Sequence, residues 1–407
     1  ALLDAEDGLL GNPVSYRDHR TEGMVEAADS IIPLEEIYRQ TGNQIMPINS
    51  LFQLIALAKK NPGQLAAARS FLNLPDLFNF WLCGEKASEF TIATTTQCFD
   101  PLEMEWAWDM LEKLGIHSDI FERIVFPGTI IGNMRKDICR EIDTSRVRVV
   151  AVCSHDTQSA ILAVPAVDPH FLYLSSGTWS LMGTELDELV ITTDTWNKNL
   201  TNEGGFGGKF CLLKNITGLW ILQECRRQWL DAGVEYSYDD LTLMAGETES
   251  FRSLIDTSDG TFFTPGRMVN RIQDYCRKSG QPVPETPGEI TRCILESLAM
   301  EYRTVAGQIS EVTGHMHPVT HIIGGGSQNK LLNQLTANAT GCRVVSGPVE
   351  ATAAGNILVQ AMAAGEVESI SDARRVVSRS FGLKTFMPEK LTEFDNAYAR
   401  YMGLEKY

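Results

Sequence analysis

The sequence lacks the residue clusters that mark several large classes of protein. Its nine cysteines are scattered and include no C-x-x-C pair, and its seven histidines include no H-E-x-x-H or comparable spacing. A zinc site or a disulfide framework needs such clusters, so we expect reduced thiols in a cytoplasmic protein. No run of about 18 apolar residues is present, which argues against a membrane-spanning helix.

Positive charge is also scarce. The chain carries 35 Lys and Arg against 52 Asp and Glu, a formal net charge of −17. Nucleic acid and anionic membranes attract basic surfaces, so neither is expected as a partner. ATP stays possible, because helix N-termini and Mg²⁺ supply positive charge locally. The start, Ala1-Leu2-Leu3-Asp4, has neither the basic nor the apolar region of a signal peptide.

Three nucleotide-binding signatures are missing as well. No G-x-x-x-x-G-K-[ST] loop occurs, and the glycine loop and H-R-D motif of protein kinases are absent. The glycines that begin at Gly324 do not complete G-x-G-x-x-G, because Asn329 stands where the last glycine is needed. A P-loop enzyme is therefore excluded, and a nicotinamide-dependent dehydrogenase is disfavoured.

The patterns that are present predict two α/β domains. A chain of 407 residues, 43% hydrophobic and 21% charged, is too long for one compact core. Helical periodicity dominates up to about residue 126, with helices expected over 49–60 and 75–83. It gives way to a β-branched run at 147–152, so we predict a domain boundary between residues 145 and 146, with domains 1–145 and 146–407.

Strands and helices alternate beyond that boundary. Strands are expected at 171–174, 179–182, 319–323 and 343–345, and helices at 220–229, at 290–312, from 329 and near 352. The glycine-rich segment 204–208 fits a hairpin loop better than a phosphate cradle, because no helix follows it. This order predicts a mixed sheet with helices packed against it.

The most informative junction is Ser154-His155-Asp156-Thr157, between the run at 147–152 and a helix-compatible segment. An Asp between a strand and a helix lies where ligands bind in open sheets, and it can accept a proton from a substrate hydroxyl. An Asp at the start of a helix can also simply cap it, because Asp is a frequent N-cap residue. The motif by itself leaves both roles open and favours capping.

Glycines beside strands form further candidates for backbone contact with a ligand. The turn Ser175-Ser176-Gly177-Thr178 suits either a phosphate contact or an ordinary hairpin. Gly324-Gly325-Gly326 follows a predicted strand and precedes a helix, an arrangement typical of nucleotide sites. The small residues of 346–356 suit close helix packing or a nearby ligand, and packing is favoured.

Together these segments resemble the FGGY family of carbohydrate kinases, which includes glycerol kinase, xylulokinase and L-rhamnulose kinase. The resemblance extends over essentially the whole chain and is greatest to the L-rhamnulose kinases. The stretches that carry it are 16–21 (YRDHRT), 89–97 (EFTIATTTQ), 154–157 (SHDT), 174–183 (LSSGTWSLMG), 201–205 (TNEGG), 213–220 (LKNITGLW), 323–333 (IGGGSQNKLLN) and 347–356.

The resemblance implies two actin-like (ribonuclease H-like) ATPase domains around a cleft, with ATP and Mg²⁺ as cofactors. It implies an ATP-dependent kinase that phosphorylates the 1-hydroxyl of L-rhamnulose, with Asp156 as the catalytic base. By the same resemblance His155 and Thr157 line the sugar pocket, with Asn49 and Gln53 as further sugar contacts. The implied nucleotide contacts are Gly177, Thr178, Asn215, Gln223, Gly324, Gly325 and Gly326. The metal ligands and the oligomeric state stay open.

One feature of the family has no counterpart in these 407 residues. Family members open with an Asp-x-Gly hairpin loop that grips the terminal phosphates, followed by further strands of the first domain. We therefore expect the first domain to lack its N-terminal strands, and the chain to be catalytically impaired, since phosphoryl transfer depends on positioning and charge neutralisation. The alternatives to an L-rhamnulose kinase are an L-fuculose kinase of the same family and a non-catalytic actin-like nucleotide or sugar-binding protein.

Overall fold

The structure of the protein, a computed structural model, describes residues 1–16 and 18–404, so Arg17 of the stretch 16–21 lies outside it. The described chain divides into two compact units. The first comprises Ala1–Ala163, Glu185–Leu213 and Thr352–Ala373, and the second comprises Val164–Thr184, Lys214–Ala351 and Arg374–Tyr407. The first segment of the first unit thus runs from Ala1 to Ala163. The domain boundary between residues 145 and 146 stays a prediction.

Short helices and two-residue strands dominate the first unit. Its α-helices are α1 (Met24–Asp29), α2 (Leu34–Thr41), α3 (Ser50–Lys60), α4 (Pro62–Ala67), α5 (Leu74–Cys83), α6 (Phe90–Ala93), α7 (Trp108–Lys113), α8 (Lys136–Glu141), α9 (Asp156–Leu162), α10 (Thr193–Asn197) and most of α16 (Ala351–Ala363), with the start of α17 (Ile370–Ser380). Its strands are β1 (Leu2–Leu3), β2 (Ser70–Phe71), β3 (Ser88–Glu89), β4 (Phe99–Asp100), β5 (Glu105–Trp106), β6 (Ile124–Val125), β7 (Ile130–Asn133), β8 (Arg148–Val150), β11 (Thr201–Gly204) and most of β12 (Phe210–Ile216).

The core of the first unit forms around α3. Leu51, Phe52 and Ile55 lie on one helical face and are buried among the aromatic side chains of α6, β4 and β5. Two lysines end the helix, where cations interact favourably with the helix dipole. The strands pair as β1–β2, β4–β5, β7–β8 and β11–β12, all antiparallel, and as β3–β6, which is parallel. The predicted helices at 49–60 and 75–83 are confirmed.

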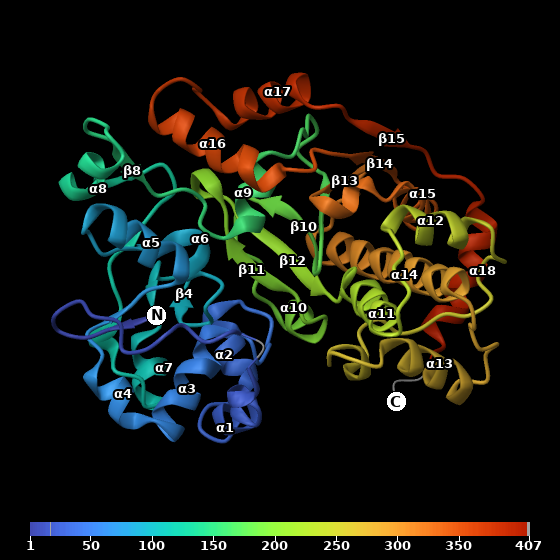
Figure 1. Ribbon diagram of the computed structural model, residues 1–407, viewed down its shortest axis with the longest axis horizontal. Helices are drawn as coiled ribbons and strands as arrows, with labels where there is room; N and C mark the ends of the chain where they lie inside the picture. Colours follow the sequence, from blue (N-terminus) through green and yellow to red (C-terminus); the bar gives the residue numbers. More distant parts are fainter. Residues whose placement is uncertain (17, 405–407) are drawn as a thin grey trace. The chain divides into compact units, whose positions relative to one another are not determined.

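The second unit contains longer elements (Figure 1). Its α-helices are α11 (Trp220–Asp231), α12 (Tyr238–Gly246), α13 (Met268–Lys278), α14 (Pro287–Thr313), α15 (Lys330–Thr340) and α18 (Leu391–Met402), with most of α17. Its strands are β9 (Leu172–Ser176), β10 (Ser180–Leu186, up to Thr184), β13 (Val319–Ile323), β14 (Arg343–Ser346) and β15 (Lys384–Phe386). The 3₁₀ helices are η1 (His19–Thr21), η2 (Ser118–Ile120) and η3 (Phe206–Gly208) in the first unit, and η4 (Gly260–Phe262) and η5 (Gly325–Gln328) in the second.

These strands form a mixed sheet in the order β10-β9-β13-β14-β15. The central strands β9, β13 and β14 are parallel, while β10 and β15 are antiparallel to their neighbours. All five residues of β13 are buried, as expected for a parallel strand whose two faces are covered. The mixed α/β sheet, its predicted strands and the helices near 220, 290, 329 and 352 are confirmed.

Acid sensitivity follows from a buried histidine in β13. Burial, together with the nearby charges of Arg374 and Arg343, lowers the pKa of His321 to about 4. The unfolded chain binds this proton near pH 6.5, so stability is lost as the pH falls from about 6.5 towards about 4. We expect His321 to account for up to about 3 kcal/mol of that loss.

The measurement is urea unfolding of the wild type and of His321→Gln at a series of pH values. The wild type should lose more unfolding free energy than the variant between about pH 7 and about pH 5. Subtracting the unfolding free energy of the variant from that of the wild type at each pH removes the contribution of the titrating groups that both proteins share. Parallel losses in both would show that His321 is not the cause.

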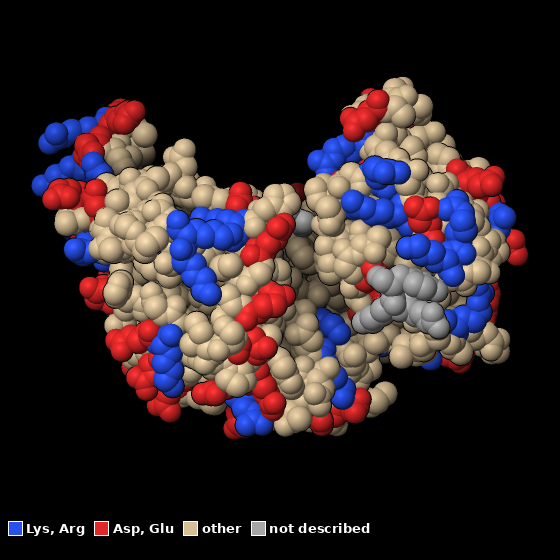
Figure 2. All heavy atoms as spheres, turned by 90° about the horizontal axis from the view of Figure 1, so that it is seen from below, with Lys and Arg blue, Asp and Glu red and all other residues tan. Residues whose placement is uncertain are grey.

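The surface carries charges of both signs. Figure 2 shows Lys and Arg side chains interspersed with Asp and Glu over the face that is drawn. Among the described helices, none has the length and apolar character needed to cross a membrane.

Candidate functional site

The first candidate site lies at the N-terminus of α9. His155 occupies the N-cap position without a capping side-chain bond, and Asp156 is the first helical residue. The Asp156 side chain is 78% exposed. Its Oδ1 accepts a hydrogen bond from the backbone N–H of Thr157 at 2.7 Å. The carboxylate therefore satisfies one free N–H of the first turn and is still open to solvent, so the capping and base roles do not exclude each other.

A buried carboxylate holds the loop in front of Asp156. Glu89 is fully buried, caps α6, and accepts hydrogen bonds from the Thr91 and Ile92 backbones, the Thr91 hydroxyl and the Ser154 N–H, at 2.6–3.2 Å. Thr91 Oγ1 in turn accepts the His155 N–H at 3.2 Å. Burial raises the pKa of Glu89 to about 7 despite these donors. Ser154 and His155 are thus anchored to α6 through their backbone.

A second buried carboxylate faces the His155 ring. Nδ1 of His155 lies 3.3 Å from Oε2 of Glu203, and Nε2 lies 3.6 Å from Oδ1 of Asp156. The Glu203 side chain is 6% exposed and the His155 side chain 16%. Burial alone would lower the pKa of His155, but the negative charges around it, with Glu203 the largest contributor, raise it above its usual value. The surrounding carboxylates therefore outweigh burial and favour protonation of the ring.

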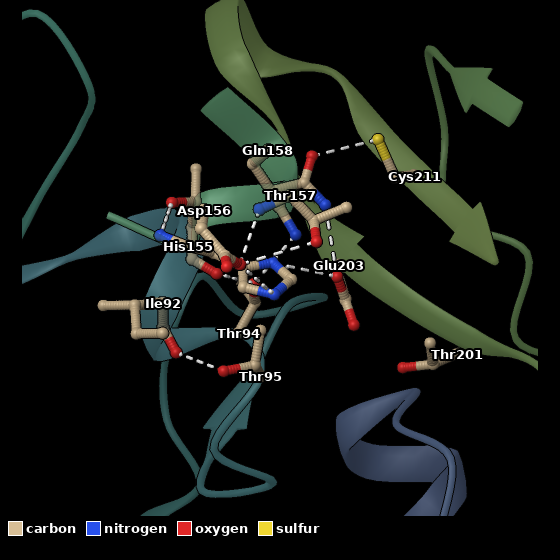
Figure 3. Close-up of polar contacts among 12 residues, drawn as sticks. Ile92, Thr94, Thr95, His155, Asp156, Thr157, Gln158, Thr201, Glu203 and Cys211 are labelled. Atoms are coloured by element: carbon tan, nitrogen blue, oxygen red, sulfur yellow. Dashed lines mark hydrogen bonds and ion pairs between the residues drawn. The ribbon is translucent and has the colours of Figure 1, made fainter. Parts of the chain in front are cut away.

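Gln158 connects this pair to the neighbouring strand. Its Nε2 donates to Oε2 of Glu203 at 3.1 Å, and its Oε1 accepts from the Cys211 thiol at 3.1 Å. Figure 3 shows these contacts from β12 through Gln158 to Glu203 and the His155 ring. A continuous set of polar contacts thus runs from Cys211 to Asp156.

The two residues proposed as further sugar contacts lie at the start of α3. Asn49 Nδ2 donates to the carbonyl of Gln44 and to Oε1 of Gln97, both at 3.0 Å. Gln97 Nε2 donates to the Asn43 carbonyl, and Asn43 Nδ2 reaches Thr201 Oγ1 on β11. Asn49 is thus linked by hydrogen bonds to the strand that carries Glu203.

Gln53 lies outside this network. It donates from Nε2 to the Ile48 carbonyl at 3.1 Å and accepts at Oε1 from Arg20 at 2.6 Å. Its described polar contacts therefore lead to Arg20 instead of the strand that carries Glu203.

Five of the predicted nucleotide residues, Gly177, Thr178 and Gly324–Gly326, follow the carboxyl ends of the parallel strands β9 and β13 in the second unit. Gly177 and Thr178 form the turn after β9, whose backbone carbonyls accept from Leu219 and Trp220 at the start of α11. Thr178 Oγ1 donates to Oε1 of Gln223 on that helix at 3.2 Å. Asn215 is half-buried near the end of β12.

The triple glycine is the next loop along this edge. A Cβ on Gly326 would lie 2.0 Å from Ser176 Oγ, and a Cβ on Gly324 would lie 3.0 Å from the Ser176 carbonyl. Gly324 also has φ +81°, a conformation that favours glycine. Gly325 is exposed, with open space where a side chain would be. The loops after β9 and β13 are therefore in direct contact and present bare backbone, as ligand sites in open sheets do.

The small residues of α16 pack against α9. A Cβ on Gly355 would lie 1.7 Å from the carbonyl oxygen of Ser159, and the Thr352 hydroxyl donates to the Asp156 carbonyl at 3.3 Å. This agrees with the packing interpretation of 346–356. Within the described residues, no group of three or more His, Cys, Asp or Glu is arranged to hold a metal ion.

Glu89, Gln158 and Glu203 were not predicted as site residues. The contacts that tie them to the site join residues far apart in the sequence: 45 positions separate Gln158 from Glu203, and 65 separate Glu89 from Ser154. The one available signal was that Glu203 and Glu89 stand in stretches, 201–205 and 89–97, that carry the family resemblance.

Comparisons with known proteins identify a matching family and related proteins. Residues 1–163 match the N-terminal domain of the FGGY family of carbohydrate kinases, and residues 172–364 match its C-terminal domain. A curated protein from Bacteroides thetaiotaomicron, named rhamnulokinase, is 45% identical over 98% of this chain and 82% of its own length. A rhamnulokinase from Oceanobacillus iheyensis is 41% identical over 95% of this chain and 81% of its own length.

Solved structures show the same fold at lower identity. The crystal structure of gluconate kinase from Lactobacillus acidophilus superposes with a TM-score of 0.80 at 17% identity, over 99% of this chain and 80% of that one.

Proposed function

Because the chain belongs to the FGGY family of carbohydrate kinases, we propose that it transfers the γ-phosphoryl group of ATP to the 1-hydroxyl of L-rhamnulose. The two relatives at 45% and 41% identity are named rhamnulokinase, which supports this substrate. The observation that carries the proposal is the exposed Asp156 carboxylate, held at the start of α9 beside His155 and Thr157.

In the proposed reaction Asp156 accepts the proton of the 1-hydroxyl as the oxygen attacks the γ-phosphorus. A new O–P bond forms, the bond from the γ-phosphorus to the β,γ-bridging oxygen breaks, and ADP leaves. His155 and Thr157, with Asn49 and Gln53, orient the sugar. Such a base contributes a factor of about 10² to 10⁴, and most of the remaining acceleration comes from positioning and charge stabilisation.

The backbone of the loops after β9 and β13 would hold the nucleotide. The N–H groups of Gly177 and Gly324 already donate to the carbonyls of Trp179 and Pro348, so these glycines would serve by letting a ligand approach the backbone closely. The backbone of Thr178, Gly325 and Gly326 would supply the contacts to phosphate or ribose oxygens. Gln223 and Asn215 lie on the elements beside these loops. We propose that Mg²⁺ arrives with ATP, bound mainly by phosphates and water, and we assign it no protein ligand and no step. All nine cysteines lie within the described residues and are free thiols, which supports a cytoplasmic protein.

The test measures ADP release with MgATP and a panel of acceptors: L-rhamnulose, L-fuculose, L-ribulose, D-xylulose and glycerol. We expect the highest kcat/KM with L-rhamnulose. A preference for L-fuculose would support the same phosphoryl transfer reaction but identify L-fuculose as the substrate. No turnover with any sugar, in a protein that still binds ADP, would favour the non-catalytic alternative.

The assay should compare the printed chain with the product of the whole gene, since the curated relatives are longer than the 407 residues. For the printed chain alone we propose impaired turnover, because these residues contain no Asp-x-Gly hairpin loop in its family setting. Equal activity of the two proteins would contradict that proposal.

A further inference from the structure

We infer that Glu203 is a positioning residue of the site: through its contact with His155 Nδ1 it fixes the ring so that Nε2 faces the Asp156 carboxylate. This inference rests on the proposed function for its catalytic meaning. The geometry that carries it is the pair of distances on the two ring nitrogens, 3.3 Å to Glu203 and 3.6 Å to Asp156. Nδ1 is buried and has no aligned hydrogen-bond acceptor among the described residues, which leaves the Glu203 carboxylate as its nearest charged neighbour.

Glu203 is itself held rigidly by its strand. All four residues of β11 are buried, and the strand pairs with β12 so that Glu203 stands directly opposite Cys211. The next residue, Gly204, donates its N–H to Thr94 Oγ1 at 2.8 Å and packs so closely on Phe90 that a Cβ would lie 2.3 Å from the ring. A carboxylate on a strand locked to α6 keeps one position, which a positioning role requires.

Gln158 fixes the orientation of the carboxylate. Opposite residues of an antiparallel pair present their side chains on the same face, so Glu203 and Cys211 both reach Gln158. The amide accepts the Cys211 thiol at Oε1 and donates from Nε2 to Glu203 Oε2, the same oxygen that faces His155. That oxygen therefore accepts the neutral amide of Gln158 on one side and lies 3.3 Å from His155 Nδ1 on the other.

The charges around His155 are all negative. Glu203 faces it from β11, Asp156 from its own helix and Glu89 from the start of α6. Of these carboxylates, burial raises the pKa of Glu89 to about 7, so Glu89 is only partly charged near neutral pH. Glu203 is the largest of the contributions that favour the charged ring, which makes it the side chain whose removal should affect His155 most.

The position of the His155 ring bears directly on Asp156. A ring held with Nε2 3.6 Å from Oδ1 of Asp156 restricts where that carboxylate can lie before the sugar binds. Phosphoryl transfer depends chiefly on such positioning, so the orientation of Asp156 matters more than its strength as a base.

The experiment compares the wild type with Glu203→Gln, which keeps the size of the side chain and removes its charge. The first readout is the titration of His155 in histidine-labelled protein by NMR, assigned with His155→Gln. The His155 titration should move to lower pH in Glu203→Gln. In Glu203→Asp, which keeps the charge on a shorter side chain, it should lie between the two.

The second readout is the pH profile of kcat/KM with L-rhamnulose, from about pH 5.5 to about pH 9.5. The basic limb should move to lower pH in Glu203→Gln, with a loss of about tenfold on that side and a smaller loss on the acid side. A purely structural role would lower kcat/KM at all pH values and leave the limbs in place.

A matched control is Glu296→Gln, which neutralises another buried carboxylate, ion-paired with Arg292 at 2.5 Å and remote in sequence from both candidate sites. It should lower the unfolding free energy without moving either the His155 titration or the basic limb. An unmoved His155 titration in folded Glu203→Gln overturns the inference. If wild type turns over no sugar but the titration shifts as expected, the proposed function fails and the contact through Glu203 is upheld.

Discussion

Replacing Asp156 with Asn should lower kcat with L-rhamnulose by about 10³-fold while ADP binding stays unchanged. The amide keeps the size of the carboxylate and can still accept the Thr157 N–H that now bonds to Oδ1. It cannot take the proton of the attacking hydroxyl. Since the residue is 78% exposed, loss of its charge should cost little folding free energy. Stopped-assay kinetics and calorimetric titration with ADP measure the two quantities.

The matched control is Asp194→Asn. Asp194 is also an exposed carboxylate in the first turn of a short helix of the same unit, α10, and has no place in the proposed reaction. Its replacement should leave kcat within about twofold of the wild type, since exposed substitutions away from a site have small effects. A fall in ADP affinity in Asp156→Asn would argue against the role of general base, because nucleotide contacts are proposed in the second unit.

Elements with strong local signals could be predicted from the sequence. Helix α3 has regular apolar spacing, a polar N-cap and lysines at its end, and strand β13 is a short β-branched and apolar run that stops at glycine. Both begin and end within a residue of their predicted limits. Such elements are determined by neighbours three or four residues away, and those neighbours are visible in the sequence.

The carboxylates behind Asp156 could not be predicted in this way. Glu203 stands in a glycine-containing segment whose local signal is a hairpin turn, and the structure confirms that turn between β11 and β12. Its contacts to His155 and Gln158 are made across 48 and 45 positions of the chain. The spacing of residues around 203 does not predict these contacts, because they form only when β11 packs beside α9.

The same limit explains the ambiguity at Asp156. Local pattern favoured a helix cap, and the carboxylate does accept a first-turn N–H. What raises the interest of this residue is its surroundings: a loop anchored by Glu89, a neighbouring His155 held by Glu203, and a helix, α16, that approaches from 196 positions further along the chain. The helices and strands can thus be predicted from local sequence, whereas the candidate site depends on how they pack together.

That packing predicts a large effect for Gly355→Ala. Gly355 lies within α16, where alanine normally favours the helix. Here the new Cβ would stand 1.7 Å from the carbonyl oxygen of Ser159, a backbone atom of α9 that cannot rotate away. Helix α16 must therefore move off α9, and the contact of Thr352 with the Asp156 carbonyl should be lost with it. We expect a fall of about 3 kcal/mol in unfolding free energy, together with a lower kcat.

Gly307→Ala separates this clash from the general effect of the substitution. Gly307 lies within α14, and nothing stands within 4 Å of the position its Cβ would take. The exchange should stabilise that helix by up to about 1 kcal/mol and leave kcat unchanged. In urea unfolding the two variants should therefore change in opposite directions, and in steady-state kinetics only Gly355→Ala should lose activity. If Gly355→Ala were as stable as Gly307→Ala, α16 could not pack against α9 as described, and the support that it gives to the start of α9 would be disproved.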